Sequence, residues 1–287
     1  MEARTRRQAT PYRLLRQPRP KRCTLLASWP GVGNVALIVA RYLRDRLEAE
    51  EVGEIEASNF FEPVGVMVRE NVVEEPRFPE SKFYYWRNAR TGEGLLLFIG
   101  EEQPNSRGYE MVKCVLDVAE RFNVDRVYSC AAAITQRRYP ERSRVWAVAT
   151  RKELLQELTM YDVVLRGDLR IAGLNGLILG SAKERGVAGV SLLGEVPGYA
   201  TQMPNPEAAL AVLRVLGAML SLDVDLTELT DLARQSEEEM EKIAKQATAV
   251  YIDRFTEPIW EQGESGGNGN GDGDEDEEDE EDEEDQS

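Results

Sequence analysis

The sequence predicts an α/β fold in which a mainly parallel sheet carries helices on both faces. Short apolar runs alternate along the chain with longer segments of helical periodicity, which is typical of such folds. Several of these runs are apolar without interruption, as strands covered on both faces are. With 287 residues, of which 42% are hydrophobic, the chain can form one large domain with a full core.

The predicted elements begin at Cys23 and follow one another in order. Strands are expected at 23–28, 64–68, 83–86, 95–99, 125–130, 145–149 and 190–193. The second and third of these belong to a less regular, partly antiparallel insertion. Helices are expected at 34–50, 105–122, 152–159, 174–185 and 206–222. Asn34 stands where it could cap the first helix.

The two ends of the chain differ from its body in charge. The net charge is −17, but residues 261–287 alone hold 15 acidic residues and no basic one. Residues 1–22 instead carry eight basic residues and one acidic residue. The predicted organisation is therefore a basic flexible arm (1–22), an α/β domain (23–224), a C-terminal helical segment (225–262) and a disordered acidic tail (263–287).

The chain has no histidine, and this excludes several kinds of active site. A Ser–His–Asp triad, a Cys–His pair and a histidine-ligated zinc site all need an imidazole. The cysteines Cys23, Cys114 and Cys130 form no CxxC pair and lie in apolar stretches, so buried reduced thiols are expected. We predict no catalytic residue, no metal site and no cofactor.

No apolar run in the sequence approaches the length that a membrane-spanning helix requires. The N-terminal arm lacks the apolar segment of a secretory signal. We therefore expect a cytoplasmic protein with no membrane partner.

Four unusual loops, each following a predicted strand, carry the candidate binding residues. They are residues 29–34, 100–104, 131–133 and 194–199. Because the carboxyl ends of parallel strands meet at one edge of a sheet, these loops are expected to line one cleft. With the start of the helix at 174, they supply the candidate cleft residues Gly31, Gly33, Asn34, Glu101, Gln103, Asn175, Gly176, Glu195 and Tyr199.

Most of these residues admit a structural interpretation beside the functional one. The Gly31–Asn34 loop could bind an anion, but it lacks the third glycine of a dinucleotide site and the Gly-Lys-Ser/Thr of a P-loop, so we favour a tight turn. Glu101 and Glu102 could hold Mg²⁺ or act as an acid–base pair, but we favour Glu101 as an acceptor of backbone N–H bonds and Glu102 as solvated. Asn175–Gly176 is either an anion site or, more simply, a turn and helix cap.

A basic cluster lies between the predicted strands at 125–130 and 145–149. It consists of Arg137, Arg138, Arg142 and Arg144, beside Tyr139. Such a cluster could contact RNA or an acidic partner. Because no RNA-binding motif accompanies it, we expect a solvated loop and no nucleic-acid partner.

An apolar stripe at helical spacing marks the charged segment after residue 225. The candidate oligomer interface within it consists of Met240, Ile243, Ala247 and Val250. A helix of this kind buries its stripe either in its own subunit or in a neighbouring one. Both alternatives are open from the residues alone, and we predict that part of the stripe crosses a subunit boundary.

Taken together, the loops resemble the PAC2 (proteasome assembly chaperone 2) family. The resemblance rests on the strings WPGVGNV at 29–35, GEEQP at 100–104, GLNGL at 173–177 and LLGEVPGY at 192–199, and it runs from about Leu25 to Leu222. The sequence departs from the family at Ala131 and Ala132, where glycines are expected, so a close backbone approach at that loop is not expected.

The resemblance implies an α/β core similar to that of nucleoside phosphorylases, a trimeric or larger ring-like homo-oligomer, and a proteasome-type protein partner. Some archaeal relatives bind proteasomal particles through a C-terminal hydrophobic-Tyr-x motif. Residues 285–287 are Asp-Gln-Ser, so docking through that motif is not expected. The function expected is that of an assembly chaperone or interaction scaffold. The alternative is a small-molecule enzyme such as an ATP-dependent carboxylate–amine ligase or a phosphorylase-like protein.

Overall fold

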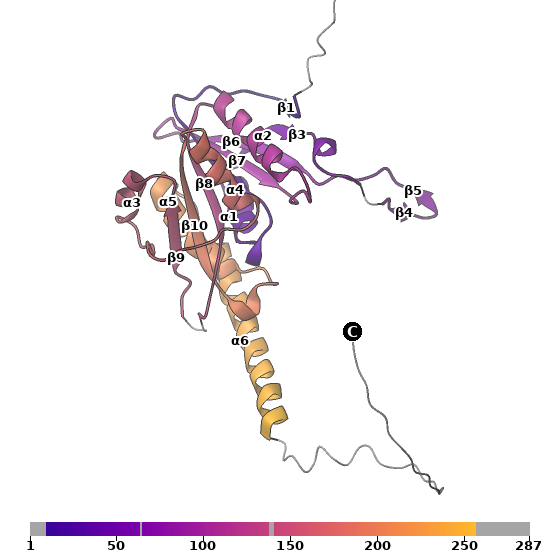
Figure 1. Ribbon diagram of the computed structural model, residues 1–287, viewed down its shortest axis with the longest axis vertical. Helices are drawn as coiled ribbons and strands as arrows, with labels where there is room; N and C mark the ends of the chain where they lie inside the picture. The colour runs from indigo at the N-terminus through magenta and orange to yellow at the C-terminus, as the bar shows by residue number, and fades with distance from the viewer. Residues whose placement is uncertain (1–9, 64, 138–140, 257–287) are drawn as a thin grey trace, which may run out of the picture. The chain divides into compact units, whose positions relative to one another are not determined.

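The computed structural model describes the backbone of residues 10–63, 65–137 and 141–256, and the side chains of these as far as Lys242. An eight-stranded sheet lies between two layers of helices (Figure 1). This confirms the predicted α/β class. The residues up to Lys242 form one compact unit, and the packing of helices and strands given below is that of this unit.

The strands are β1 (Tyr12–Leu14), β2 (Cys23–Ser28), β3 (Glu50–Ile55), β4 (Val68–Arg69), β5 (Val72–Val73), β6 (Ser81–Arg87), β7 (Gly94–Gly100), β8 (Val124–Thr135), β9 (Val145–Ala149) and β10 (Ala188–Pro197). The helices are α1 (Val35–Arg46), α2 (Gly108–Arg121), α3 (Lys152–Leu158), α4 (Leu174–Glu184), α5 (Pro206–Leu220) and α6 (Thr227–Thr256). Short 3₁₀ turns occupy Val32–Asn34, Ala57–Asn59 and Gly198–Ala200.

The sheet is mixed, so the prediction of a mainly parallel sheet is wrong. The strand order is β1-β3-β6-β7-β2-β8-β10-β9, and the four strands from β7 to β10 are parallel. On one side of them β6, β3 and β1 pair antiparallel, and on the other side β9 does. The turn between β6 and β7 spans only residues 88–93, and so short a connection can join only antiparallel neighbours.

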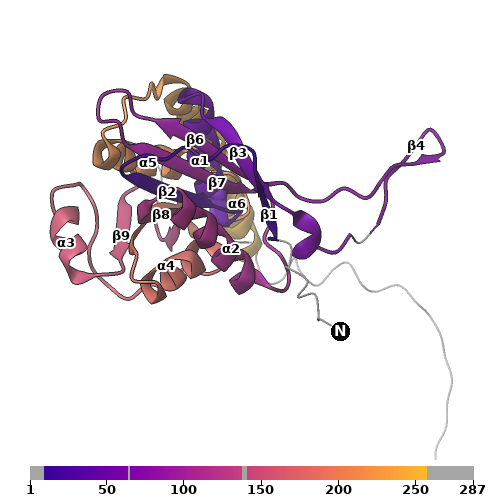
Figure 2. The ribbon, with the colours of Figure 1, turned by 90° about the horizontal axis from the view of Figure 1, so that it is seen from above.

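The strands alternate their side chains between two cores. Leu26 and Leu97 face the core under α1 and α5, whereas Leu25 and Phe98 face the core under α2 and α4. Figure 2 shows the two pairs of helices on opposite sides of the sheet. Full burial of one such side chain stabilises the fold by about 1.5–3 kcal/mol. The prediction of helices on both faces is therefore confirmed.

Three differences from the prediction lie in the N-terminal part of the chain. Regular structure begins before Cys23, because Tyr12–Leu14 forms β1 and pairs with β3. β3 itself was not predicted, since three of its six residues are glutamates. The strand expected at 64–68 is reduced to β4, which pairs with β5 in a separate two-stranded sheet. Residues 1–9 and 64 lie outside the described part of the chain.

The first part of α6 packs on its own subunit. Leu229, Ala233 and Met240 are all at most 2% exposed and belong to the core under α1 and α5. Met240 is therefore not available to a neighbouring subunit, and its prediction as an interface residue is wrong. The side chains of Ile243, Ala247 and Val250 lie outside the described residues, as does the predicted acidic tail at 263–287.

The described helices include none that is both long enough and apolar enough to cross a membrane.

Candidate functional site

A cleft opens at the carboxyl ends of β2, β8 and β10, which is where open α/β sheets place ligands. Its volume is about 450 Å³. Gly31 and Val32 form one side, the segment from Leu169 to Ala172 forms another, and Trp146 closes it from β9. Most of the lining is apolar.

The floor of the cleft is the last part of β8. Pairing between β2 and β8 ends at Ala27 and Ser129, whereas pairing between β10 and β8 continues to Pro197 and Thr135. Within the described residues, β8 therefore has a neighbouring strand on one side only from residue 130 onwards. Ala131, Ala132 and Ala133 lie in this strand and line the cleft, so the prediction that residues 131–133 form a loop is wrong.

Two side-chain amides fasten the loop after β2 to the start of α4. Asn175 donates from Nδ2 to the carbonyl oxygen of Trp29 (3.0 Å) and accepts at Oδ1 from the backbone N–H of Trp29 (2.9 Å). Gln103 donates from Nε2 to the carbonyl oxygen of Pro30 (2.6 Å) and accepts at Oε1 from the N–H of Leu174 (2.9 Å). We call this set of four hydrogen bonds the loop clamp. Both amides are engaged with backbone groups, although Asn175 also lines the cleft.

The glycine loop after β2 is a tight turn. Gly33 has φ 64° and accepts at its carbonyl a hydrogen bond of 2.8 Å from the N–H of Asn205. A Cβ atom on Gly33 would lie 3.1 Å from Cβ of Asn205 and 3.3 Å from Cγ2 of Val196. Asn34 occupies the N-cap position of α1, but its exposed side chain makes no capping hydrogen bond, so the predicted capping is wrong. This geometry supports a structural role for Gly33.

Gly176 likewise has a packing role. A Cβ atom there would lie 2.2 Å from the carbonyl oxygen of Ile171, which is far inside van der Waals contact. The turn before α4 therefore depends on glycine at this position.

Glu101 acts within the sheet rather than in the cleft. Its carboxylate Oε2 accepts from the N–H of Glu80 at 2.9 Å, and its own N–H donates to the carbonyl oxygen of Glu80 at 2.8 Å. These bonds join the end of β7 to the residue before β6. The neighbouring Glu102 is exposed. Neither carboxylate lines the cleft, and Glu101 takes the backbone-accepting role that the sequence favoured.

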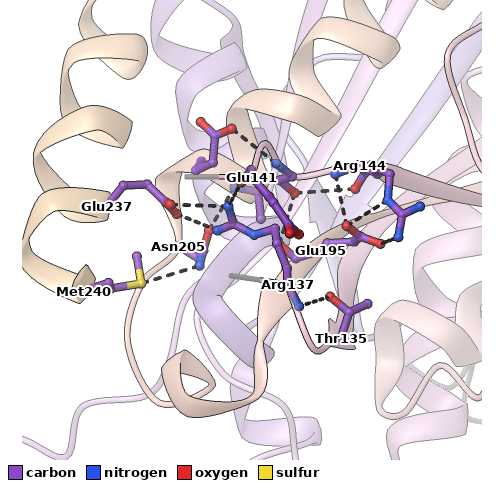
Figure 3. A network of polar contacts seen from close by, with 11 residues as sticks. Thr135, Arg137, Glu141, Arg144, Glu195, Asn205, Glu237 and Met240 are labelled. Carbon is purple, nitrogen blue, oxygen red and sulfur yellow. Dashed lines mark hydrogen bonds and ion pairs between the residues drawn. The ribbon is translucent and has the colours of Figure 1, made fainter. Parts of the chain in front are cut away.

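Glu195 is a buried carboxylate held by Trp146 of β9 and by Arg144, the residue before β9 (Figure 3). It accepts hydrogen bonds from Nη2 of Arg144 (2.8 Å), Nε of Arg144 (3.2 Å) and Nε1 of Trp146 (2.8 Å). Burial alone would raise the pKa of Glu195, but the hydrogen bonds from Arg144 and Trp146 outweigh burial and lower it. Glu195 therefore positions Trp146, whose ring lines the cleft, and does not itself reach the lining.

Of the predicted cleft residues, only Gly31 and Asn175 line the cleft. Tyr199 is 51% exposed and lies outside the lining. The sequence analysis missed Val32, Trp146, Leu193 and the segment from Leu169 to Ala172. Trp146 and the segment from Leu169 to Ala172 belong to none of the motif strings, and only the folded chain brings them to the cleft.

The cleft offers little to acid–base or nucleophilic chemistry. Among the described lining residues Arg170 is the only charged one. The thiol of Cys130, in β8 itself, is fully buried, and burial raises its pKa to about 12. No group of three potential metal-ligating His, Cys, Asp or Glu side chains occurs within the part of the chain that the structure describes.

The predicted basic cluster is not a solvated loop. Arg137 is buried and pairs with Glu237 of α6 at 2.6 Å (Figure 3). It also donates to the carbonyl oxygen of Glu141. Arg144 pairs with Glu195, and Arg138 lies outside the described residues. Arg142 is exposed. Two of the four arginines thus hold the fold together instead of forming one basic surface.

Comparison with known sequences places most of the chain in a single family. A family model described as the PAC2 family matches residues 25–244. An uncharacterised protein of Methanocaldococcus jannaschii is 27% identical over 224 residues, which cover 77% of this chain and 83% of that protein.

Solved structures give the same result. PbaB of Pyrococcus furiosus, an archaeal proteasome activator, is 27% identical with a TM-score of 0.70, over 81% of this chain and 98% of that one. PbaA of the same organism, an archaeal homologue of proteasome-assembly chaperone, is 25% identical with a TM-score of 0.62, over 84% and 100%. A PAC2 family protein of Streptomyces avermitilis, 21% identical with a TM-score of 0.68 over 80% and 99%, shares the fold.

Proposed function

The chain belongs to the PAC2 family, and from this premise we propose that it is an assembly chaperone or interaction scaffold that acts as a homo-oligomer on a proteasome-type complex. The observation that carries the proposal is the likeness to PbaB and PbaA in both sequence and fold. One of these is a proteasome activator and the other a homologue of proteasome-assembly chaperone. Both descriptions refer to the proteasome, so a proteasome-type particle is the partner we propose here.

The chemistry of the cleft supports a binding role. The motif side chains Asn175 and Gln103 are engaged with backbone groups in the loop clamp, so they position loops rather than contact a substrate. The remaining lining is mostly apolar with one arginine. A surface of this composition suits a segment of protein better than a highly charged small molecule.

The alternative, an ATP-dependent carboxylate–amine ligase or a phosphorylase-like enzyme, finds less support. Such an enzyme needs cations for phosphate and carboxylates for a metal ion or for proton transfer. The described residues that line the cleft include no carboxylate and no lysine. Thermal denaturation with ATP and Mg²⁺, with nucleosides and with phosphate distinguishes the two functions. A ligand at a hundred times its dissociation constant would stabilise the fold by about 2.7 kcal/mol, whereas the proposed function predicts no shift.

The proposed oligomer is a trimer or a larger ring. Ile243, Ala247 and Val250 remain candidates for one interface, because the helical stripe that they continue has to be buried. Substituting Ile243 by Asp would then lower the subunit count before it unfolds the core, because an unpaired charge in an apolar contact is costly.

Affinity purification of the tagged full chain from its native cells, followed by mass spectrometry, tests the proposed partner. The proposal predicts enrichment of proteasome core or ATPase subunits over a purification with an unrelated protein of similar charge. Absence of these subunits, together with a thermal shift by a nucleotide, would instead favour the enzyme.

A further inference from the structure

An apolar hairpin stands in solvent between β3 and β6. It comprises residues 66–73, with β4 and β5 as its strands. Met67, Val68, Val72 and Val73 are each more than 60% exposed, and Val66 is 49% exposed. Contiguous exposed side chains of this kind usually mark a contact surface.

The hairpin is isolated from the main sheet. Among the strands that the structure describes, β4 pairs with β5 alone, and Figures 1 and 2 both show the pair standing away from the eight-stranded sheet. The ion pairs Arg69–Glu74 and Arg77–Glu74 connect the hairpin only to the segment that follows it. A two-stranded sheet on its own is marginally stable in water, and its free edges invite pairing with another strand. The hairpin therefore needs a covering surface.

The cleft offers a surface of matching character. Its exposed apolar side chains are Val32 (37%), Ile134 (59%) and Leu169 (41%). Its floor, from residue 130 to Thr135 of β8, has a sheet partner on one side only. A free strand edge among apolar side chains is the arrangement that receives an added strand from another chain.

The hairpin and the cleft also carry side chains of opposite charge. Glu70 lies at the tip of the hairpin, where it and Asn71 both have positive φ. Arg170 is the one charged side chain among the described lining residues of the cleft. Neither Glu70 nor Arg170 forms an ion pair with any residue that the structure describes. The hairpin thus carries a negative tip, and the cleft carries a positive group.

We propose that the apolar hairpin of one subunit lies in the cleft of the next subunit, where it adds to the free edge of β8 and places Glu70 near Arg170. The inference rests on the proposed homo-oligomer and names its contact. The occupant is a second copy because the chain's own hairpin points away from its sheet, and because each copy supplies both complementary surfaces. A contact between two different surfaces of identical chains generates a ring when the rotation closes.

The segment that connects the hairpin to β6 is long enough for this contact. It runs from Glu74 to Glu80, and seven extended residues reach about 23 Å. The hairpin can therefore cross from one subunit to another while its own subunit stays folded.

The first test is the subunit count of a variant with Val68→Asp and Val72→Asp, measured by sedimentation velocity at the concentration used for the wild type. Because both side chains are more than 60% exposed, circular dichroism should stay at its wild-type value. The proposal predicts loss of the wild-type oligomer. Met160→Asp is the matched control, since Met160 is 75% exposed and belongs to neither surface, and this variant should keep the wild-type mass.

The second test reverses the charges. Glu70→Arg and Arg170→Glu should each raise the dissociation constant of the oligomer about tenfold, and the two together should restore it. An unchanged subunit count in the Val68→Asp, Val72→Asp variant, or no restoration in the double reversal, would overturn the hairpin contact while the proposed homo-oligomer stands. A wild-type protein that is itself monomeric would overturn both.

Discussion

Asn175 shows at the residue scale how the motif loops work. Asn175 is 3% exposed, and its amide hydrogen-bonds to both the backbone N–H and the backbone carbonyl of Trp29. The Asn175 amide can make both hydrogen bonds only if the loop after β2 and the start of α4 are held in place. Gln103 holds the same loop through the carbonyl oxygen of the next residue, Pro30. The motif therefore fixes the rim of the cleft.

We expect Asn175→Ala to lower the free energy of unfolding by about 2–3 kcal/mol, because the buried N–H and carbonyl of Trp29 both lose their partner. Chemical denaturation measures this loss. Asn105→Ala is the control, since Asn105 is exposed in the loop before α2, and its effect should stay within about 0.5 kcal/mol. An Asn175→Ala protein of wild-type stability that fails to bind its partner would show that the side chain serves recognition instead.

Gly33 gives a second prediction at this scale. Valine at this position would have to adopt φ near 64° and would press on Asn205 and Val196. We expect Gly33→Val to destabilise the fold by more than about 2 kcal/mol. In Gly198→Val the new Cβ meets nothing within 4 Å, so a much smaller effect is expected in the same melting experiment. If the Gly33→Val protein keeps the wild-type melting temperature, the tight-turn explanation fails.

Glu195 links stability to pH. Its pKa is lowered in the folded protein, so the ionised carboxylate stabilises the fold at pH values above the pKa of an unfolded glutamate, about 4.3. This contribution is lost as the pH falls through the lower pKa of the folded state. The difference in unfolding free energy between the wild type and Glu195→Gln should thus be constant near neutral pH and shrink in acid. A difference that stays constant down to pH values well below about 4 would contradict this assignment.

At the scale of elements, a buried ion pair fastens α6 to the body of the unit. The side chain of Arg137 is 2% exposed and that of Glu237 is 13% exposed. Removal of one partner from such a pair leaves a buried charge without compensation. The pair thus makes the position of the first half of α6 depend on the segment after β8.

We expect Glu237→Ala to cost about 3 kcal/mol of unfolding free energy, measured in urea. Glu238→Ala is a matched control on the next residue, because Glu238 pairs with Arg234 on the exposed side of the same helix. Its loss should cost no more than about 0.5 kcal/mol. Equal effects of the two substitutions would mean that the Arg137–Glu237 pair does not hold the helix.

Some of the helices and strands could be predicted from the sequence, and others could not. Continuous apolar runs such as β2 and β7 and the periodic helices could be located, because burial on both faces or on one stripe leaves its mark in the sequence. β3 could not be located from the sequence, because glutamates occupy half of it. The end of β8 could not either, because a run of alanines is typical of neither strands nor loops.

The candidate site was predicted less completely than the fold. Its place at the carboxyl ends of the parallel strands follows from general rules of α/β sheets. Of the residues that the loop motifs supplied, Gly31 and Asn175 line the cleft, whereas Glu101, Glu195 and Gln103 act on backbone groups and on β9 behind the lining. A sequence motif does not reveal in which direction a side chain points. In each of these residues, that direction determines whether the side chain lines the cleft.

At the scale of the whole molecule, the chain combines an apolar cleft, a cleft rim held by the hydrogen bonds of the loop clamp, and an exposed apolar hairpin. A rigid rim limits the conformational entropy lost on binding, and apolar surfaces supply the driving force for association. These properties suit a protein that binds other proteins. They agree with the proposed role in a proteasome-type complex.

The most direct test of this role is sedimentation velocity of the purified chain mixed with the proteasome core particle and, separately, with the proteasomal ATPase ring from the same cells. We predict that the chain alone sediments as a homo-oligomer and that part of it moves with one of the two particles at micromolar concentration. A chain that sediments as a monomer, and that leaves the boundaries of both particles unchanged, would contradict it.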